Sequence, residues 1–151
     1  MIINTDAIVL KTFSYGETSL ISRCFTKHKG KVSFIIKGAK SKKNLISPYF
    51  QPLSFINIIY KENEKRELQI VSKVSFVQIW TQIPLSLRKM SLSQSILEIS
   101  DFTLEKNDPY PNLFNILIKT LQIFESGDID ENILFWNYEF RILSEMGFMI
   151  N

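Results

Sequence analysis

The sequence predicts an α+β protein in which an all-β unit, residues 1–80, precedes an all-helical unit, residues 81–151. The first unit contains five short runs of β-branched and aromatic residues with turn residues between them, which is typical of a small antiparallel barrel or sandwich. After residue 80 the apolar residues recur every three or four positions, which is the period of amphipathic helices. The period changes near residues 79–84, where we expect the boundary between two domains.

The five predicted strands are 6–13, 18–26, 31–37, 53–61 and 67–77. Tyr15-Gly16-Glu17 supplies the first turn, and a hairpin loop with Gly30, which is free to take a positive φ, supplies the second. Residues 38–52 are basic and then contain two prolines, so we expect a long loop there with one helical turn. Alternation in the first strand predicts two faces: Ala7, Val9, Lys11 and Phe13 on one, and Ile8, Leu10 and Thr12 on the other.

Three helices are predicted in the second half. The first covers about residues 86–106, and Pro111 is well placed at the start of the second. The second helix is amphipathic and ends at Ser126-Gly127. Asp128 or Asp130 is expected to cap the third. The apolar residues of the third helix run at helical spacing up to Gly147: Ile133, Trp136, Phe140, Leu143 and Met146.

Charge is segregated along the chain. Residues 1–80 hold 13 Lys and Arg against 5 Asp and Glu, whereas residues 81–151 hold 5 against 10. No acidic residue lies between Glu17 and Glu62. A polyanionic partner explains this segregation, and nucleic acid is the commonest one; a solvated lysine-rich face is the alternative. The densest part, Lys37-Gly-Ala-Lys-Ser-Lys-Lys43, favours phosphate contacts that do not depend on nucleotide sequence.

Aromatic residues are interleaved with these positive charges. Proteins that bind single strands stack bases on exposed rings beside a basic groove. Most rings on strands belong to a core, so we expect most of these to be buried. Tyr15, in a turn, and Tyr49, beside the basic loop, are the better candidates for base stacking.

No group of residues in the sequence predicts catalysis, a metal site or a cofactor. The single cysteine, Cys24, excludes an internal disulfide and fits a reducing compartment. We expect Cys24 to be buried and His28 to be exposed in its lysine-rich turn, and nothing supports a nucleophilic triad built from the two. Because we find no signal peptide and no apolar run of membrane-spanning length, we expect a soluble cytoplasmic protein.

Several segments, in this order and spacing, carry a resemblance to one family. They are Ala7-Ile-Val-Leu-Lys-Thr12, Tyr15-Gly-Glu-Thr-Ser-Leu-Ile21, Phe25-Thr-Lys-His-Lys-Gly-Lys31, Lys37-Gly-Ala-Lys-Ser41, residues 45–53, Asn112-Leu-Phe-Asn-Ile-Leu117 and Phe140-Arg-Ile-Leu-Ser-Glu-Met-Gly-Phe148. The ordered set resembles the bacterial recombination mediators of the RecO family. The resemblance covers essentially the whole chain, with the N-terminal domain and part of the helical domain.

The resemblance implies an OB-fold barrel and a role in DNA repair and recombination without bond chemistry, so no catalytic residue and no cofactor are expected. Members of the family bind single- and double-stranded DNA and anneal complementary strands in the bacterial cytoplasm, at the nucleoid. With the partner RecR they help to load the RecA recombinase onto strands coated by single-strand-binding protein. The basic DNA-contacting surface of the family maps onto eight residues: Arg23, Lys27, Lys29, Lys31, Lys37, Lys40, Lys42 and Lys43.

Members of the family continue beyond this match into a cysteine cluster and further helices. Contact with the tail of single-strand-binding protein depends on those later parts. An incomplete helical domain predicts exposed apolar surface around Trp136, Phe140 and Leu143. The residues alone are also compatible with two other functions. The protein could be a protein–protein adaptor whose lysines only solubilise it, or an RNA-binding OB module. An enzyme ranks last.

Overall fold

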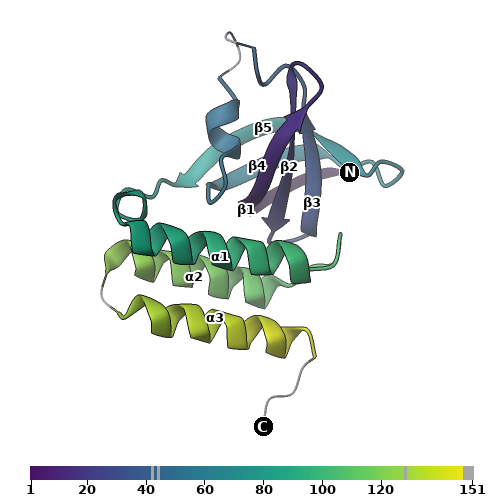
Figure 1. Ribbon diagram of the computed structural model, residues 1–151. Coiled ribbons are helices and arrows are strands. Elements are labelled where there is room, and N and C mark those ends of the chain that lie inside the picture. The colour runs from purple at the N-terminus through teal and green to yellow at the C-terminus, as the bar shows by residue number, and fades with distance from the viewer. Residues whose placement is uncertain (42, 44, 128, 148–151) are drawn as a thin grey trace.

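A closed barrel of five strands stands on a stack of three helices in the computed structural model, which describes residues 1–41, 43, 45–127 and 129–147 (Figure 1). Lys42 and Asp128, for which the sequence predicted a DNA contact and a possible helix cap, lie outside the described residues. The predicted α+β class is confirmed, and the β unit is a barrel.

The barrel strands are β1 (Ile2–Tyr15), β2 (Ser19–Thr26), β3 (Gly30–Ile36), β4 (Phe55–Lys61) and β5 (Leu68–Gln78). They follow the order β1-β2-β3-β5-β4 around the closed barrel. Neighbouring strands are antiparallel except β3 and β5, which run parallel over a short stretch. The predicted helical turn in the long loop is the 3₁₀ helix η1 (Ser47–Phe50). All five predicted strands are therefore present, with β1 longer than expected.

A β-bulge in β1 changes which face its residues occupy. Val9 pairs with Cys24 and Lys11 pairs with Arg23, so Leu10 is an extra residue without a partner on β2. Before the bulge, Ala7 and Val9 lie in the barrel core. The prediction that Lys11 and Phe13 share that face is wrong, because the bulge reverses the alternation and leaves them exposed.

Thr12, which was predicted on the opposite face from Val9, lies on the inner side of the barrel after the bulge. Its hydroxyl donates to the Phe50 carbonyl oxygen at 2.6 Å and lies 2.9 Å from the hydroxyl of buried Ser22. After the bulge, the even-numbered position therefore faces inward. The odd-numbered positions, from Lys11 to Tyr15, are turned to the outer surface.

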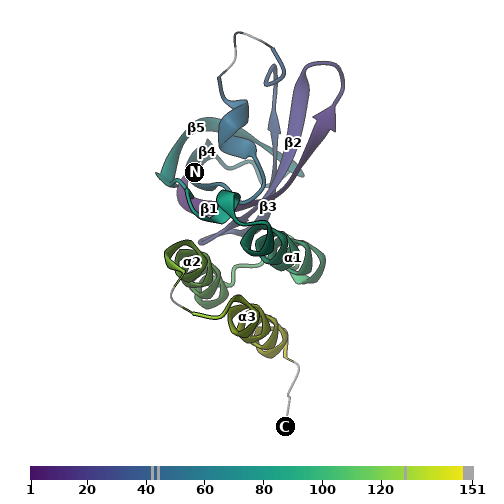
Figure 2. The same cartoon turned by 60° about the vertical axis from the view of Figure 1, so that its left-hand side comes forward.

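The helices are α1 (Leu87–Thr103), α2 (Pro111–Ser126) and α3 (Glu131–Glu145), and the short 3₁₀ helix η2 (Ile83–Leu85) leads into α1. The predicted end of α2 is confirmed, because Gly127 takes a left-handed conformation with φ of 76°. The Asp130 carboxylate caps α3 by accepting the Asn132 N–H at 2.8 Å. Helices α1 and α2 lie against the barrel, and α3 lies farthest from it (Figure 2).

One apolar core joins the barrel to the helices. Ile8 and Leu10 of β1 pack outward against the helical layer, together with Phe25 of β2. Trp80 lies at the junction, and its indole N–H donates to the Leu53 carbonyl oxygen at 2.8 Å. Because this core is continuous from the strands to α3, the barrel and the helices form one packed body.

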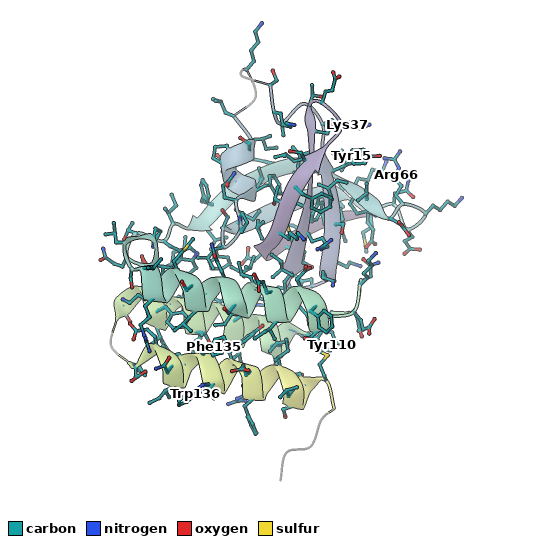
Figure 3. The ribbon with its side chains drawn as sticks, viewed as in Figure 1. Tyr15, Lys37, Arg66, Tyr110, Phe135 and Trp136 are labelled. Atoms are coloured by element: carbon teal, nitrogen blue, oxygen red, sulfur yellow. The ribbon has the colours of Figure 1, made fainter. Side chains whose placement is uncertain are left out.

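Helix α3 has apolar side chains on two faces. Leu134, Tyr138 and Ile142 are buried against the other helices, and the Tyr138 hydroxyl lies 2.6 Å from that of Ser100. The predicted exposed surface on this helix is confirmed, since Trp136 is 63% exposed and Phe140 is 48% exposed. Figure 3 shows Trp136 on the side of α3 that is turned away from the rest of the molecule.

Candidate nucleic-acid interface

The outer face of the barrel carries an apolar row that crosses four strands. Phe13 of β1 pairs with Ile21 of β2, Ile21 pairs with Ile35 of β3, and Ile35 pairs with Ile70 of β5. Partners in such a register project from the same face of a sheet. Phe13 is 38% exposed, and Ile70 is also exposed. Ile21 is buried and Ile35 is half-buried, so the row exposes its apolar surface mainly through Phe13 and Ile70 at its two ends.

Basic and polar residues flank this row on both sides. On the side of the helices, Lys11 pairs with Arg23, and Arg23 pairs with Ser33. On the other side, Tyr15 pairs with Ser19, and Lys37 directly follows the end of β3 beside it. Figure 3 shows Tyr15 and Lys37 projecting from the same side of the barrel. The apolar row is therefore bordered by cations on both sides.

The two predicted stacking residues differ in how free their rings are. Tyr15 is 53% exposed at the end of β1. Tyr49 is half-buried and already stacks on Phe76, with ring centroids 4.5 Å apart and an interplanar angle of 28°. One face of the Tyr49 ring is therefore covered by the protein itself. Tyr15 is the ring available to a base, and the role of both residues in stacking stays a prediction.

Arg23 and Lys31, two of the eight predicted DNA contacts, are engaged by helix α1. The Arg23 guanidinium donates two hydrogen bonds to the Asp101 carboxylate, at 2.9 and 2.7 Å, and these bonds raise the pKa of Arg23. Lys31 donates to the Asp101 main-chain oxygen at 2.6 Å, and its burial lowers its pKa. Their observed role is to tie the barrel to the helices, and their contact with DNA stays a prediction.

The other predicted basic residues fall into two separate groups. Lys27 and Lys29 lie near the helical end of the barrel, where Lys29 makes an ion pair of 3.3 Å with Glu62. Lys37, Lys40 and Lys43 are exposed at the far end, and within the described ranges they make no ion pair. Three of the eight therefore remain free cations, and Lys40 lies beside the turn that follows Tyr15, because its N–H donates to the Thr18 carbonyl oxygen at 2.9 Å. The Lys42 position lies outside the described residues.

The turn between β4 and β5 adds a cation that the sequence analysis did not single out. Arg66 is exposed on this turn, where it lines a pocket together with Lys29 and Asn107. Buried Gln69 orders the turn, because its side chain accepts the Asn63 N–H at 3.0 Å and donates to the carbonyl oxygens of Asn63 and Arg66. Neighbouring glutamates balance the charge of Arg66, so this segment of the sequence does not stand out as basic.

The remaining titratable groups offer little chemistry. Cys24 is fully buried, as expected, and burial raises the pKa of its thiol to about 12. His28 is exposed, as expected. In the part of the chain that the structure describes, no three histidine, cysteine or acidic side chains gather closely enough to hold a metal ion. No described helix is both long and apolar enough to cross a membrane.

Family models match almost the entire chain. The model of the recombination protein O N-terminal domain matches residues 1–80, and the model of the C-terminal domain matches residues 84–151. This chain belongs to the RecO family. Its barrel is therefore the OB-fold of the RecO N-terminal domain, as the resemblance implied.

Curated RecO relatives extend well beyond the matched region. The DNA repair protein RecO of Streptococcus gordonii is 32% identical over 149 residues, which are 99% of this chain and 56% of that protein. The RecO protein of Salinibacter ruber is 32% identical over 120 residues, 80% of this chain and 46% of that protein. That of Chloroherpeton thalassium is 26% identical over 151 residues, 58% of its length. The chain spans about half the length of these RecO relatives.

Proposed function

We propose that this chain is a non-enzymatic DNA-binding mediator of recombination and DNA repair. The observation that carries the proposal is the apolar row from Phe13 to Ile70, bordered by Tyr15 and the free lysines, on the outer face of an OB barrel. OB-folds bind oligonucleotides across their second and third strands, between the loops that join strands 1–2 and 4–5. Here Tyr15 ends β1 directly before the first of these loops, and the second loop carries Arg66.

Each part of this surface has a physical role in the proposal. An exposed ring such as Tyr15 stacks on a base of any sequence, which contributes roughly 1–3 kcal/mol per base. Lys37, Lys40 and Lys43 neutralise phosphates and release counterions, so binding weakens as salt rises. The phosphate contacts act on single and double strands alike. Neutralising two strands at once lowers their mutual repulsion, which favours annealing of complementary strands.

The cellular role that we infer follows the RecO family. The chain acts in the bacterial cytoplasm, at the nucleoid, together with RecR, and helps to load RecA onto single strands coated by single-strand-binding protein. The contact with single-strand-binding protein depends on parts of RecO proteins that lie beyond the match. No bond is made or broken, so the surface needs only to bind, align and release strands.

A pair of charge-reversal variants tests the DNA surface. Lys37→Glu/Lys40→Glu removes two free cations beside Tyr15, whereas Lys119→Glu/Arg141→Glu makes the same charge change on exposed positions of α2 and α3. We expect the first variant to lower affinity for a labelled single strand at least about fivefold, and the second to change it less than about twofold. Fluorescence anisotropy at constant salt measures both.

Two results would contradict the proposal. Equal losses in both variants would mean that net charge alone attracts DNA and that the barrel face is no site. Full affinity for single-stranded DNA in the Lys37→Glu/Lys40→Glu variant would place the contact elsewhere. Tighter binding of structured RNA than of single-stranded DNA would instead favour an RNA-binding module.

A further inference from the structure

A groove of about 680 Å³ lies between the barrel and helix α1, next to the proposed DNA face. Leu10 and Lys11 of β1 form part of one wall, and Leu97 and Phe102 of α1 form part of the other. Lys106, which follows the end of α1, also lines it. The walls therefore combine apolar surface with positive charge.

Phe102 is the unusual residue of this groove. It is 93% exposed in the last turn of α1, although its neighbours Ser100 and Leu104 are buried. The ring of Phe102 is therefore open to contact with a ligand in the groove. A flat exposed ring beside positive charge is the arrangement that proteins use to stack a nucleic-acid base.

The charges of the groove favour an anion. Arg23 and Lys31 are paired with Asp101, so these three largely neutralise one another. Lys11 and Lys106 also line the groove and make no ion pair within the residues that the structure describes, while Glu98 is the remaining carboxylate. The lining residues therefore carry a net charge of about +2, with two lysines free to contact phosphates.

The groove adjoins the proposed DNA face at Lys11. Tyr15, Phe13 and Lys11 project outward from β1 at every second residue, about 7 Å apart because a strand rises about 3.3 Å per residue. Lys11 belongs both to this outward series and to the groove lining. The Arg23 guanidinium, held by Asp101, lies 5.7 Å from the centre of the Phe13 ring and so links the two surfaces.

We propose that the groove receives one unpaired nucleotide of the DNA strand bound on the barrel face. The base stacks on Phe102, and the adjoining phosphates contact Lys11 and Lys106. This inference rests on the proposed function. In a duplex the bases are stacked inside the helix and cannot reach Phe102, so the groove adds affinity for single strands only and sets the preference between strand types.

The test compares Phe102→Ala with Leu87→Ala, a truncation of an exposed apolar residue at the opposite end of the same helix. Affinities are measured by fluorescence anisotropy for a labelled single strand and for the same strand in a duplex. Loss of one stacked base is expected to weaken single-strand binding about tenfold for Phe102→Ala, with duplex binding within twofold of the wild type. Leu87→Ala is expected to match the wild type for both, and Phe102→Tyr to retain most of the single-strand affinity.

The outcomes separate this inference from the function on which it rests. If the wild type binds single strands and Phe102→Ala binds them equally well, the groove is no nucleotide site while the barrel face stands. If Phe102→Ala weakens single-strand and duplex binding by the same factor, stacking of an unpaired base is excluded. If the wild type binds neither form of DNA, the proposed function fails and the groove assignment fails with it. Thermal melting checks that Phe102→Ala folds, as expected for so exposed a side chain.

Discussion

Arg23 of the barrel and Asp101 of helix α1 face each other through two hydrogen bonds, and they are 78 positions apart in the sequence. Their side chains are 27% and 18% exposed. Lys31 adds a third contact by donating to the Asp101 main-chain oxygen. The pair therefore fixes how the end of α1 meets strands β2 and β3, next to the groove that contains Phe102.

Removing the Asp101 carboxylate should destabilise the fold. We expect Asp101→Ala to lower the free energy of unfolding by about 2 kcal/mol, because it leaves a partly buried guanidinium without its partner. Urea denaturation measures the change. Arg88→Ala is the control, since the Arg88–Glu131 pair is 3.9 Å long and the Arg88 side chain is 57% exposed. The control should lower the free energy of unfolding by less than about 0.5 kcal/mol. Equal losses of stability in the two variants would show that the Arg23–Asp101 pair does not stabilise the fold.

Gly30, the first residue of β3, lies against the connection between α1 and α2. Its φ is 71°, and a Cβ at this position would collide with the main-chain oxygen of Asp108. We expect Gly30→Ala to lower the free energy of unfolding by about 2–5 kcal/mol, because alanine is strained in the left-handed conformation and its Cβ displaces the neighbouring chain. Gly16→Ala is the matched control, because its φ is 64° but nothing lies near its Cβ. It should cost only about 1 kcal/mol. Melting temperatures within a degree of each other would contradict the close contact.

Glu125 ties α2 to the segment that joins the two halves of the chain. Its carboxylate accepts the N–H groups of Thr81, Gln82 and Ile83 at 2.6, 2.7 and 2.9 Å. Burial favours the protonated acid, but these hydrogen bonds together hold the pKa of Glu125 below its usual 4.5. The stability that the carboxylate contributes is thus fully present above pH 4.5 and is lost as the pH falls through the lower pKa of the folded state.

The substitution Glu125→Gln tests this pH dependence. Near neutral pH we expect the variant to be less stable than the wild type by roughly 1–2 kcal/mol, because a neutral amide oxygen accepts the same N–H groups more weakly. The difference should shrink as the pH falls below 4.5, since protonation removes the charge from the wild type as well. Urea denaturation of both proteins between pH 7 and pH 3 measures it. A difference that grows in acid would contradict the assigned direction.

The outer face of α3 should matter little for stability. Trp136→Gln/Phe140→Gln replaces two exposed rings, so we expect the free energy of unfolding to change by less than about 1 kcal/mol. Leu134→Ala, on the buried face of the same helix, should cost about 2–4 kcal/mol. The double variant should also scatter less light at high protein concentration, because it loses an apolar patch. A large loss of stability in the double variant would mean that this face packs within the folded chain.

The order of elements could be predicted from the sequence because it depends on local periodicity. Strands, helices and turns followed from apolar spacing, from Pro111 and Gly127, and from the left-handed glycine Gly30. The faces of β1 could not be predicted in the same way. The bulge at Leu10 is imposed by pairing with β2, and no local pattern marks the position at which the alternation reverses.

The proposed DNA surface was predictable in composition but not in detail. A lysine-rich segment predicted a basic face. However, Arg23 and Lys31 form ion pairs with Asp101, which belongs to a helix far along the chain. From the sequence, Tyr15 and Tyr49 are equally good candidates for base stacking. The difference between them arises from tertiary packing, because Phe76 covers one face of the Tyr49 ring. Phe102 lies within the first predicted helix, but the sequence does not show that its ring is exposed, because exposure of a single ring depends on tertiary packing.

The salt dependence of single-strand binding tests the central claim most directly. A labelled strand of about 30 nucleotides is titrated with the wild-type chain at several salt concentrations, and anisotropy gives the association constant. We expect its logarithm to fall linearly with the logarithm of salt concentration, with a slope of about −0.7 for each phosphate neutralised and therefore about −2 to −4 for a face with three to five free cations. No binding at low salt, or binding whose slope is near zero, would contradict a DNA site on the basic face of the barrel.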